Sequence, residues 1–481
     1  MRAAGVALFA ALALVACGGE QVGARDGASP AAELKPGALV YWETVSDSGS
    51  DQWQQAEELL RRFPEGDKWI GQLRKLVADE GLDWEQDVQP ALGETTAVAV
   101  YPTNNVVGLT NPEDPDKTVA LVAKLEKSEL DDPTVTRVVG DWVVVSENEA
   151  AIDGALQTGS GGSLAADPSF KAATDELPDD ALSRLYVDPA GALGAFASAD
   201  PAAAGAFRML GVDGLDFAVG WARAKDDGAE LAFSAGGEGA GRLLGTGEPY
   251  ASALLERVPE DAFAFVSFQG RAATSQLEEL KGNPLYAMGL RQFERELGVK
   301  VEELVSLAEG EVAFYARTAL PFPELTLMLD ADNPERARVG AEKLLRALAQ
   351  REGGEVTEDG GVTRAVIEEL TVNLGSVEDL VVFTTSKDAF DELAGPGDKL
   401  PKSDRWRSAL ESAGVPDEYT SLAYVDLAEA VPLLQAYRES AGQTDITPEV
   451  TRNLEALKTL VAWGTSDSRD VASARAFVEI D

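Results

Sequence analysis

The strongest constraint on the fold is a series of motifs that occurs twice, in the same order, along the 481 residues of the chain. In each half, a segment that ends in Gly93 or Gly310 leads into a run with strand-like composition. A turn with Asx and Pro then opens a helix, at Asp114 in the first half and at Asn333 in the second. Because each pair of motifs keeps its place in the series, the sequence predicts an internal duplication.

The later part of each half continues the series. Apolar strands are expected at 141–146 and 379–384, and each is followed by a helical pattern. A Tyr-Val-Asp strand comes next, at 186–188 and 424–426, and a predicted hairpin closes each half. The second half is longer than the first, and region 351–372 has the composition of an extended hairpin, so we expect the insertion there.

Strands and helices alternate irregularly in both halves, and short turns join many of the strands. This arrangement favours an α+β fold in which each half is a mainly antiparallel sheet covered by helices. The strict alternation of strand and helix that a doubly wound parallel sheet requires is absent. We therefore predict two homologous domains, at 37–235 and 251–481, with a Gly-rich linker at 236–250 between them.

Residues 1–16 have the layout of a signal peptide, and the residue that follows predicts a lipid anchor. Arg2 precedes an uncharged apolar run, and small residues surround the expected cleavage site. The run is too short to span a bilayer, which takes about 20 apolar residues. Cys17 is the single cysteine and follows Leu-Val-Ala, a pattern that resembles the lipobox of bacterial lipoproteins, whose cysteine is acylated. Residues 17–36 are rich in Gly, Ala, Ser and Pro and predict a flexible tether.

Composition narrows the functions that the chain can have. The net charge of −42 argues against nucleic-acid binding, which needs a basic surface. The chain has no histidine, which excludes Ser-His-Asp and Cys-His catalysis and removes the commonest ligand of zinc and copper. An enzyme would have to rely on carboxylates, Lys, Ser, Tyr or a hard metal ion. We therefore predict no catalytic residue and no cofactor.

Four of these features together resemble a family of bacterial envelope proteins, domain of unknown function 3352. They are the Leu39-Val-Tyr41 strand, the segment Asp87-Val-Gln-Pro-Ala-Leu-Gly93, the Tyr186-Val-Asp188 strand and the lipoprotein leader. The resemblance covers most of the mature chain. It implies the envelope location and the fold, and it implies no catalytic or binding residue, because the family has no established activity.

Two acidic turns offer oxygen ligands of the kind that calcium prefers. The first is 111–116, and the second contains Asp330, Asp332 and Glu335. Both turns precede helices, so helix capping also explains their composition. Neither turn has the spacing of an EF-hand loop, and the Gly-rich stretch 236–247 lacks the order of a phosphate-binding loop. The three acids of the second turn are weak candidates for a metal site.

Tyr186 and Tyr424 occupy equivalent places in the two halves, and most other aromatic residues also fall in expected strands. Core packing is the usual role of such residues. The alternative is a concave apolar face that holds a lipid, a glycan or a peptide. A cleft between the two copies is the first place where we expect a ligand.

The sequence therefore predicts a non-catalytic binding or scaffolding protein of the cell envelope. It would lie on the extracytoplasmic face of the cell membrane, anchored by the lipid on Cys17, with an unidentified ligand or envelope protein as its partner. The alternative is a carboxylate- or calcium-dependent hydrolase of envelope polymers, which predicts clustered acids with raised pKa values. A binding protein predicts a dry apolar cavity with few acids, and a purely interacting protein predicts an exposed apolar patch.

Overall fold

The structure of the chain is a computed structural model. It describes residues 29–481 except 129–133, 158–160, 176, 210, 245–246, 272–283, 298–299, 301–306, 308, 320–321, 368–369, 441–446 and 469.

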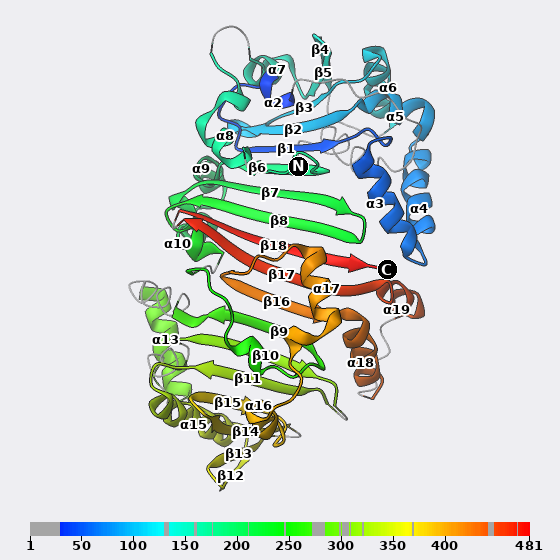
Figure 1. The fold of residues 1–481 in the computed structure, drawn as a ribbon. Helices are drawn as coiled ribbons and strands as arrows, with labels where there is room; N and C mark the ends of the chain where they lie inside the picture. The colour runs from blue at the N-terminus through cyan, green and yellow to red at the C-terminus, as the bar shows by residue number, and fades with distance from the viewer. Residues whose placement is uncertain are drawn as a thin grey trace.

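Within these described residues, eighteen strands form one sheet, and every pairing between them is antiparallel (Figure 1). The strands of the first half, from the outer edge to the middle of the sheet, are β4 (Val135–Val139), β5 (Trp142–Ser146), β3 (Asn105–Thr110), β2 (Thr95–Tyr101), β1 (Val40–Val45), β6 (Ser183–Val187), β7 (Leu215–Lys225) and β8 (Gly228–Gly237). Those of the second half, from the middle outward, are β18 (Val471–Ile480), β17 (Leu457–Ser468), β16 (Ser421–Asp426), β9 (Ala262–Gln269), β10 (Glu311–Arg317), β11 (Glu324–Asp330), β15 (Leu380–Thr384), β14 (Leu370–Val377), β13 (Val362–Ile367) and β12 (Glu355–Asp359).

Helices pack on both faces and around the margins of this sheet (Figure 1). In the first half they are α2 (Pro30–Glu33), α3 (Asp51–Arg62), α4 (Gly66–Asp79), α5 (Gln89–Leu92), α6 (Pro115–Ser128), α7 (Glu149–Ala155), α8 (Pro168–Thr174), α9 (Pro189–Ala199) and α10 (Pro201–Met209). Then come α11 (Ala240–Leu243), α13 (Pro284–Leu297), α15 (Pro334–Arg351), α16 (Ala389–Ala394), α17 (Asp404–Ala413), α18 (Leu427–Ser440) and α19 (Pro448–Leu454). The α+β class with a mainly antiparallel sheet is confirmed.

The two halves have the same strand order when each is read outward from the middle of the sheet. The order β8, β7, β6, β1, β2, β3, β5, β4 corresponds to β18, β17, β16, β9, β10, β11, β15, β14. The second half adds β12 and β13, which pair as a hairpin inside the region 351–372, where an extended hairpin was predicted. The duplicated motifs of the sequence therefore fall at matching places in one continuous sheet.

The middle of the sheet is the pairing of β8 with β18, which joins the two halves edge to edge. The Ser234 and Ser473 hydroxyls lie 2.7 Å apart across this pairing. Beside it, the Arg62 side chain of α3 donates a hydrogen bond of 2.7 Å to the Ile480 carbonyl of the second half. Backbone hydrogen bonds of a strand pair thus join the two halves, together with side-chain contacts beside that pair.

One face of the sheet, which we call the covered face, carries an aromatic cluster of the same design in each half. Tyr41 and Tyr186, paired across β1 and β6, both contact Phe170 of α8 edge-on.

In the second half, Phe265 and Tyr424 are paired across β9 and β16 and contact Trp406 of α17. Figure 1 shows α17 lying across the strands around β16. Phe265, Trp406 and Tyr424 are almost fully buried in the core of the second half. Each cluster fastens one helix to the same pair of strands, through edge-on contacts that aromatic rings favour.

Two predicted boundaries need correction. The tether was predicted to extend to residue 36, but Ala31 and Leu34 are fully buried and the Lys35 amide donates to the Ala155 carbonyl. These apolar side chains pack into the core of the first half, so the domain includes residues 30–36. The linker was predicted to begin at residue 236, but β8 continues to Gly237 and Ala240 is buried.

The glycines that open the motif series are required for a close backbone approach. A Cβ on Gly93 would overlap the Asn111 carbonyl, and a Cβ on Gly310 would overlap the Asp330 carbonyl, at the end of the second strand that follows in each case. Gly93 also has a positive φ of 65°. Steric exclusion therefore explains why glycine stands at both positions.

We predict that Gly310→Ala lowers the free energy of unfolding by about 2 kcal/mol, because the backbone of β11 must move away from the added methyl group. The matched control is Gly71→Ala in α4, where nothing lies within 4 Å of an added Cβ. That helix substitution should be neutral or stabilise by up to about 1 kcal/mol. Urea unfolding of both variants measures the difference, and equal unfolding midpoints would contradict the prediction.

Candidate binding surface

Strand geometry divides the side chains of the sheet between two faces, and the second face differs sharply from the covered face. Directly paired residues point to the same side, so partners can be followed from strand to strand. Phe233 of β8, for example, is paired with Gly220 of β7 and with Ala474 of β18. We call this second side the open face.

The open band is the central part of the open face, defined by positions that are half-buried or exposed. It crosses the ten strands from β2 to β10, five from each half, which at 4.7–4.9 Å per strand is roughly 40–45 Å. Its residues are Val98, Trp42, Ser183, Leu185, Gly220, Ala222, Leu231, Phe233, Ala474, Ala476, Ala462, Ser421, Ala423, Val266, Phe268 and Phe314.

The open band is apolar, and its exposure is unusual for apolar residues in the middle of a sheet. Leu231, Phe233 and Phe268 are 56%, 36% and 37% exposed, whereas Phe477 and Val461 on the covered face are 0% exposed. None of the residues that define the band is charged, although the chain has a net charge of −42. A partly exposed apolar surface of this kind marks an interaction site. It is a surface patch, which was the expectation for an interacting protein, and not the enclosed dry cavity expected for a binding protein.

Among the described residues, helices pack on the margins of the open face, and no residue of the band belongs to the buried clusters that they form there. Leu59 of α3 packs against Ala224 and Ile480 at one end of the central strands. Ala240 of α11 packs against Ala235 at the other end.

The two outer margins are closed in the same way. Val122 of α6 packs on β5 in the first half. Ala341 of α15 belongs to the core that covers β11 and β15 in the second half.

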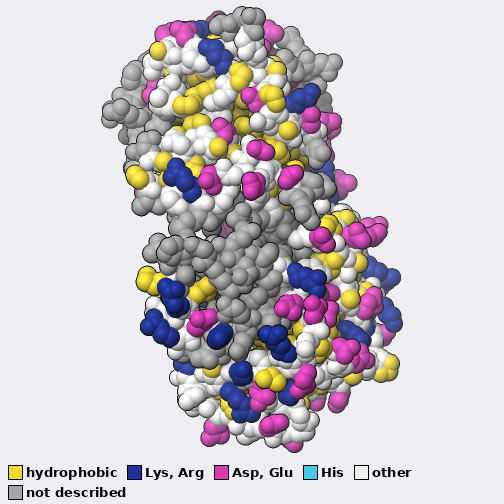
Figure 2. All heavy atoms as spheres, turned by 90° about the vertical axis from the view of Figure 1, so that its left-hand side faces the viewer, with side chains coloured by type: hydrophobic (Ala, Val, Ile, Leu, Met, Phe, Trp, Pro, Cys, Tyr) yellow, Lys and Arg dark blue, Asp and Glu magenta, His cyan; other side chains and the backbone are white. Residues whose placement is uncertain are grey.

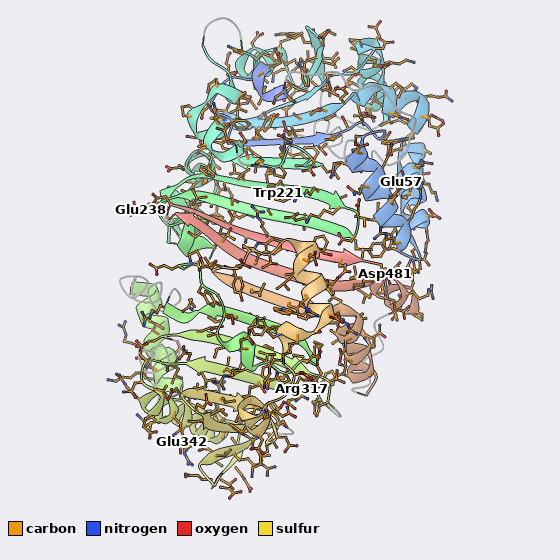
Figure 3. The ribbon with its side chains drawn as sticks, in the orientation of Figure 1. Glu57, Trp221, Glu238, Arg317, Glu342 and Asp481 are labelled. Carbon is orange, nitrogen blue, oxygen red and sulfur yellow. The ribbon has the colours of Figure 1, made fainter. Side chains whose placement is uncertain are left out.

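The charged side chains lie outside the band. Figure 2, seen from the left of Figure 1, shows acidic and basic side chains interspersed over the lower half, with hydrophobic side chains gathered in the upper half. Figure 3 shows Arg317 near one end of β10, Glu342 on the lower helices and Glu57 on α3. The charged residues labelled in Figure 3 thus lie on helices or at strand ends, and none of them belongs to the band.

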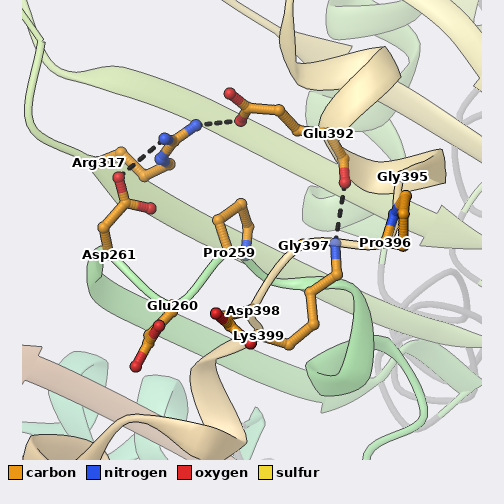
Figure 4. Close-up of a pocket in the computed structure, with 10 residues that line it drawn as sticks. All are labelled: Pro259, Glu260, Asp261, Arg317, Glu392, Gly395, Pro396, Gly397, Asp398 and Lys399. Atoms are coloured by element: carbon orange, nitrogen blue, oxygen red, sulfur yellow. Dashed lines mark hydrogen bonds and ion pairs between the residues drawn. The ribbon is translucent and has the colours of Figure 1, made fainter.

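A charged pocket of about 440 Å³ lies near the end of β10 (Figure 4). Arg317 extends into it between Asp261, at 2.8 Å, and Glu392 of α16. Burial raises the pKa of Glu324, whose carboxylate lies 3.6 Å from the same guanidinium. The three carboxylates outweigh the cost of burying the guanidinium and raise the pKa of Arg317. Because these acids all face one cation, their ion pairs with Arg317 hold the neighbouring segments of the pocket together.

The first predicted acidic turn borders a larger polar cleft of about 900 Å³. Glu113 and Asp114 line it together with Arg61 and Lys117. Asp114 also accepts a hydrogen bond of 3.0 Å from the Asp116 amide at the start of α6, as a capping residue does.

The three metal candidates of the second turn are occupied by other interactions or exposed. Asp332 pairs with Arg271 at 3.0 Å, and Glu335 pairs with Arg338 at 3.3 Å. Asp330 ends β11 with an exposed side chain. In the part of the chain that the structure describes, no group of three or more acids is placed to hold a metal ion. The turn caps α15 through Asn333, as its composition also indicated.

The remaining candidates lie elsewhere. Tyr186 and Tyr424 are at equivalent places but are buried in the two cores, and burial raises the pKa of Tyr186 to about 12. They do not line a cleft between the halves, since the halves meet as paired strands. Cys17 lies outside the described residues. Among those residues, no helix is both long and apolar enough to cross a membrane.

Fold and surface define a large α+β protein built on one antiparallel sheet with one covered and one open face. The family model described as "Protein of unknown function (DUF3352)" matches residues 122–479. The chain therefore belongs to this family, and the resemblance seen in the sequence is confirmed. No curated protein matches the chain.

Solved structures show only distant likeness. Crystal form IV of TP0453 has a TM-score of 0.26 and 13% identity, and the match covers 47% of this chain and 81% of that chain. Crystal form III has a TM-score of 0.25 and 13% identity, with 47% and 92% covered. Scores this low do not transfer a fold or a function.

Arg317→Met should destabilise the protein in a pH-dependent way. Removing the guanidinium leaves Glu324 with its raised pKa and no cation, so the cost of keeping this carboxylate ionised grows as pH rises. We expect a loss of about 2–3 kcal/mol at pH 8 and a smaller loss at pH 5.5.

Urea unfolding at the two pH values measures both losses. The control is Arg346→Met, whose exposed pair with Glu342 should contribute about 0.5 kcal/mol or less. A loss for Arg317→Met that is the same at both pH values would contradict this role of Glu324.

Proposed function

We propose that the chain is an extracytoplasmic lipoprotein, anchored through Cys17, that binds an apolar ligand on its open face without catalysing a reaction. The leader and the lipobox-like Leu-Val-Ala-Cys17 support the anchor. Replacing Cys17 by Ser is then expected to move the exported chain from the membrane fraction to the soluble fraction.

One observation carries the binding role: the open band is apolar and partly exposed, while apolar side chains on the opposite face of the same strands, such as Val461 and Phe477, are fully buried. A sheet that had only to fold would cover both apolar faces. Exposing Leu231 and Phe233 in the middle of the sheet forgoes burial that would stabilise by about 25 cal/mol for each Å². Such an arrangement is expected where a ligand completes the burial.

We further propose that the two halves arose by duplication. Support comes from the matching strand order and from the two aromatic clusters, which use α8 and α17 on equivalent strands. A capping aspartate recurs as well, because Asp188 caps α9 and Asp426 accepts from the Glu429 amide at the start of α18.

The alternative of a carboxylate-dependent hydrolase has one observation in its favour, the acids grouped around Arg317 with a raised pKa at Glu324. Hydrolysis by two carboxylates needs one acid and one base that face a shared substrate space. Asp261, Glu392 and Glu324 instead face a single guanidinium. The open band therefore supports binding better than the charged pocket supports catalysis.

The neutral dye Nile red tests the binding surface in the full chain with Cys17→Ser. We predict a fluorescence increase that falls at least fivefold in Leu231→Glu and in Phe233→Glu, because a carboxylate in the band must be desolvated when an apolar ligand binds.

The matched control is Val138→Glu on the edge strand β4, whose valine is 49% exposed and lies outside the band. It should leave the signal unchanged. Equal signals from the band variants and the control would contradict the proposed surface, provided that circular dichroism shows all of them folded.

A further inference from the structure

We infer that the occupant of the open band is the hydrocarbon chain of a membrane lipid, an inference that rests on the binding role proposed for this surface. Leu231 and Phe233, together with the small residues around them, offer the chemistry that a ligand must match. Three independent properties of the band select an acyl chain over a polypeptide: its hydrogen-bonding capacity, its place on the sheet and its surface shape.

Two of the polar side chains in and next to the band form hydrogen bonds within the protein. The Trp42 indole donates to the Ser183 hydroxyl at 2.7 Å. The Thr44 hydroxyl, which adjoins the band on β1, donates to the Leu182 carbonyl at 2.9 Å. A polypeptide laid on this surface would bury backbone N–H and C=O groups with few partners, which is unfavourable. A hydrocarbon chain has no such groups to satisfy.

The backbone beneath the band is engaged as well. Each of its ten strands is paired on both sides, as β8 is between β7 and β18. Peptides that bind to sheets usually add a strand at an open edge, and the two outermost strands of this sheet are β4 and β12. The band lies far from both edges, so strand addition cannot place a peptide there.

The surface shape of the band suits a flexible hydrocarbon chain. Gly220 and Ala222 of β7 and Ala474 and Ala476 of β18 flank the larger Leu231 and Phe233. These small residues form two shallow rows, one along β7 and one along β18, with Leu231 and Phe233 of β8 as the ridge between them. Both rows run parallel to the strands, and an extended hydrocarbon chain can lie along either of them.

The charge of the chain agrees with this assignment. The net charge is −42, yet the residues of the band carry none of it. An acyl chain lying along the band would meet no ionised group, while a polar headgroup would lie beyond its margin. The helices that close those margins carry charged side chains, including Glu342 and Arg346 of α15, which pair at 2.6 Å.

The experiment uses the full chain with Cys17→Ser and 1-monoacylglycerols with saturated chains of increasing length. These lipids are neutral, so repulsion by the acidic protein does not affect the comparison. We expect them to displace Nile red, and we expect Kd to fall about twofold to fourfold for each added methylene until the band is filled. Phe233→Glu should raise Kd at least tenfold, and Val138→Glu should not change it.

A second variant covers the case in which Phe233→Glu fails to fold. Ala474→Leu adds bulk to the floor of the band without adding charge, and it should weaken the longest chains more than the shortest. Displacement that does not depend on chain length, or that is unaffected by both band variants, would overturn the inference.

The failure of the inference and the failure of the proposed function give different results. Nile red bound to the band but not displaced by any monoacylglycerol would overturn the lipid assignment and leave the binding surface. Absence of Nile red binding would overturn both. Dimerisation in sedimentation velocity that Phe233→Glu abolishes would identify a second copy of the chain as the occupant and would also overturn the lipid assignment.

Discussion

The pairing of β8 with β18 is the interaction on which the rest of the architecture depends. Each half taken alone would end in a long strand with unpaired backbone groups, which is a site for aggregation. By pairing these two strands with each other, the chain removes both edges and makes one sheet from two. The Ser234–Ser473 contact and the Arg62 side chain that reaches the Ile480 carbonyl add side-chain links across the same junction.

The junction also creates the surface that the function requires. Five strands of the open band come from each half, and Leu231 and Phe233 lie on β8 at the junction itself. On the covered face, α8 and α17 pack on each half through an aromatic cluster, so each half has a buried core on that side of the sheet. The two faces thus have different roles, because the covered face stabilises the fold and the open face remains available to a ligand.

Local signals in the sequence predicted local structure well. Gly93 and Gly310, the Asx-Pro helix starts and the inserted hairpin are set by sterics and hydrogen bonds between residues that are near in sequence, and each is found where it was predicted. Helix α2 (Pro30–Glu33) and the buried residues after it were missed, because their burial depends on the distant segments around Ala155 and Leu164.

The binding surface could not be read from the sequence. In β18, Ala472, Ala474 and Ala476 alternate with Ser473 and Arg475, and this alternation does not show which side helices will cover. Tyr186 and Tyr424 were correctly matched with each other but belong to the cores, because tertiary packing decides which aromatic residues are buried. The acids Asp332 and Glu335 were candidate metal ligands in the sequence, but in the structure each forms an ion pair with a nearby arginine.

The central claim is that an acyl chain lies on the open face, across the junction of the two halves. The most direct test is photocrosslinking of the Cys17→Ser chain with a monoacylglycerol that carries a diazirine in its acyl chain, followed by mass spectrometric mapping of the adducts. The account predicts adducts on open-face residues of both halves, including Phe233 of β8 and Ala474 of β18. Adducts confined to the helices of the covered face, or to the charged pocket around Arg317, would contradict it.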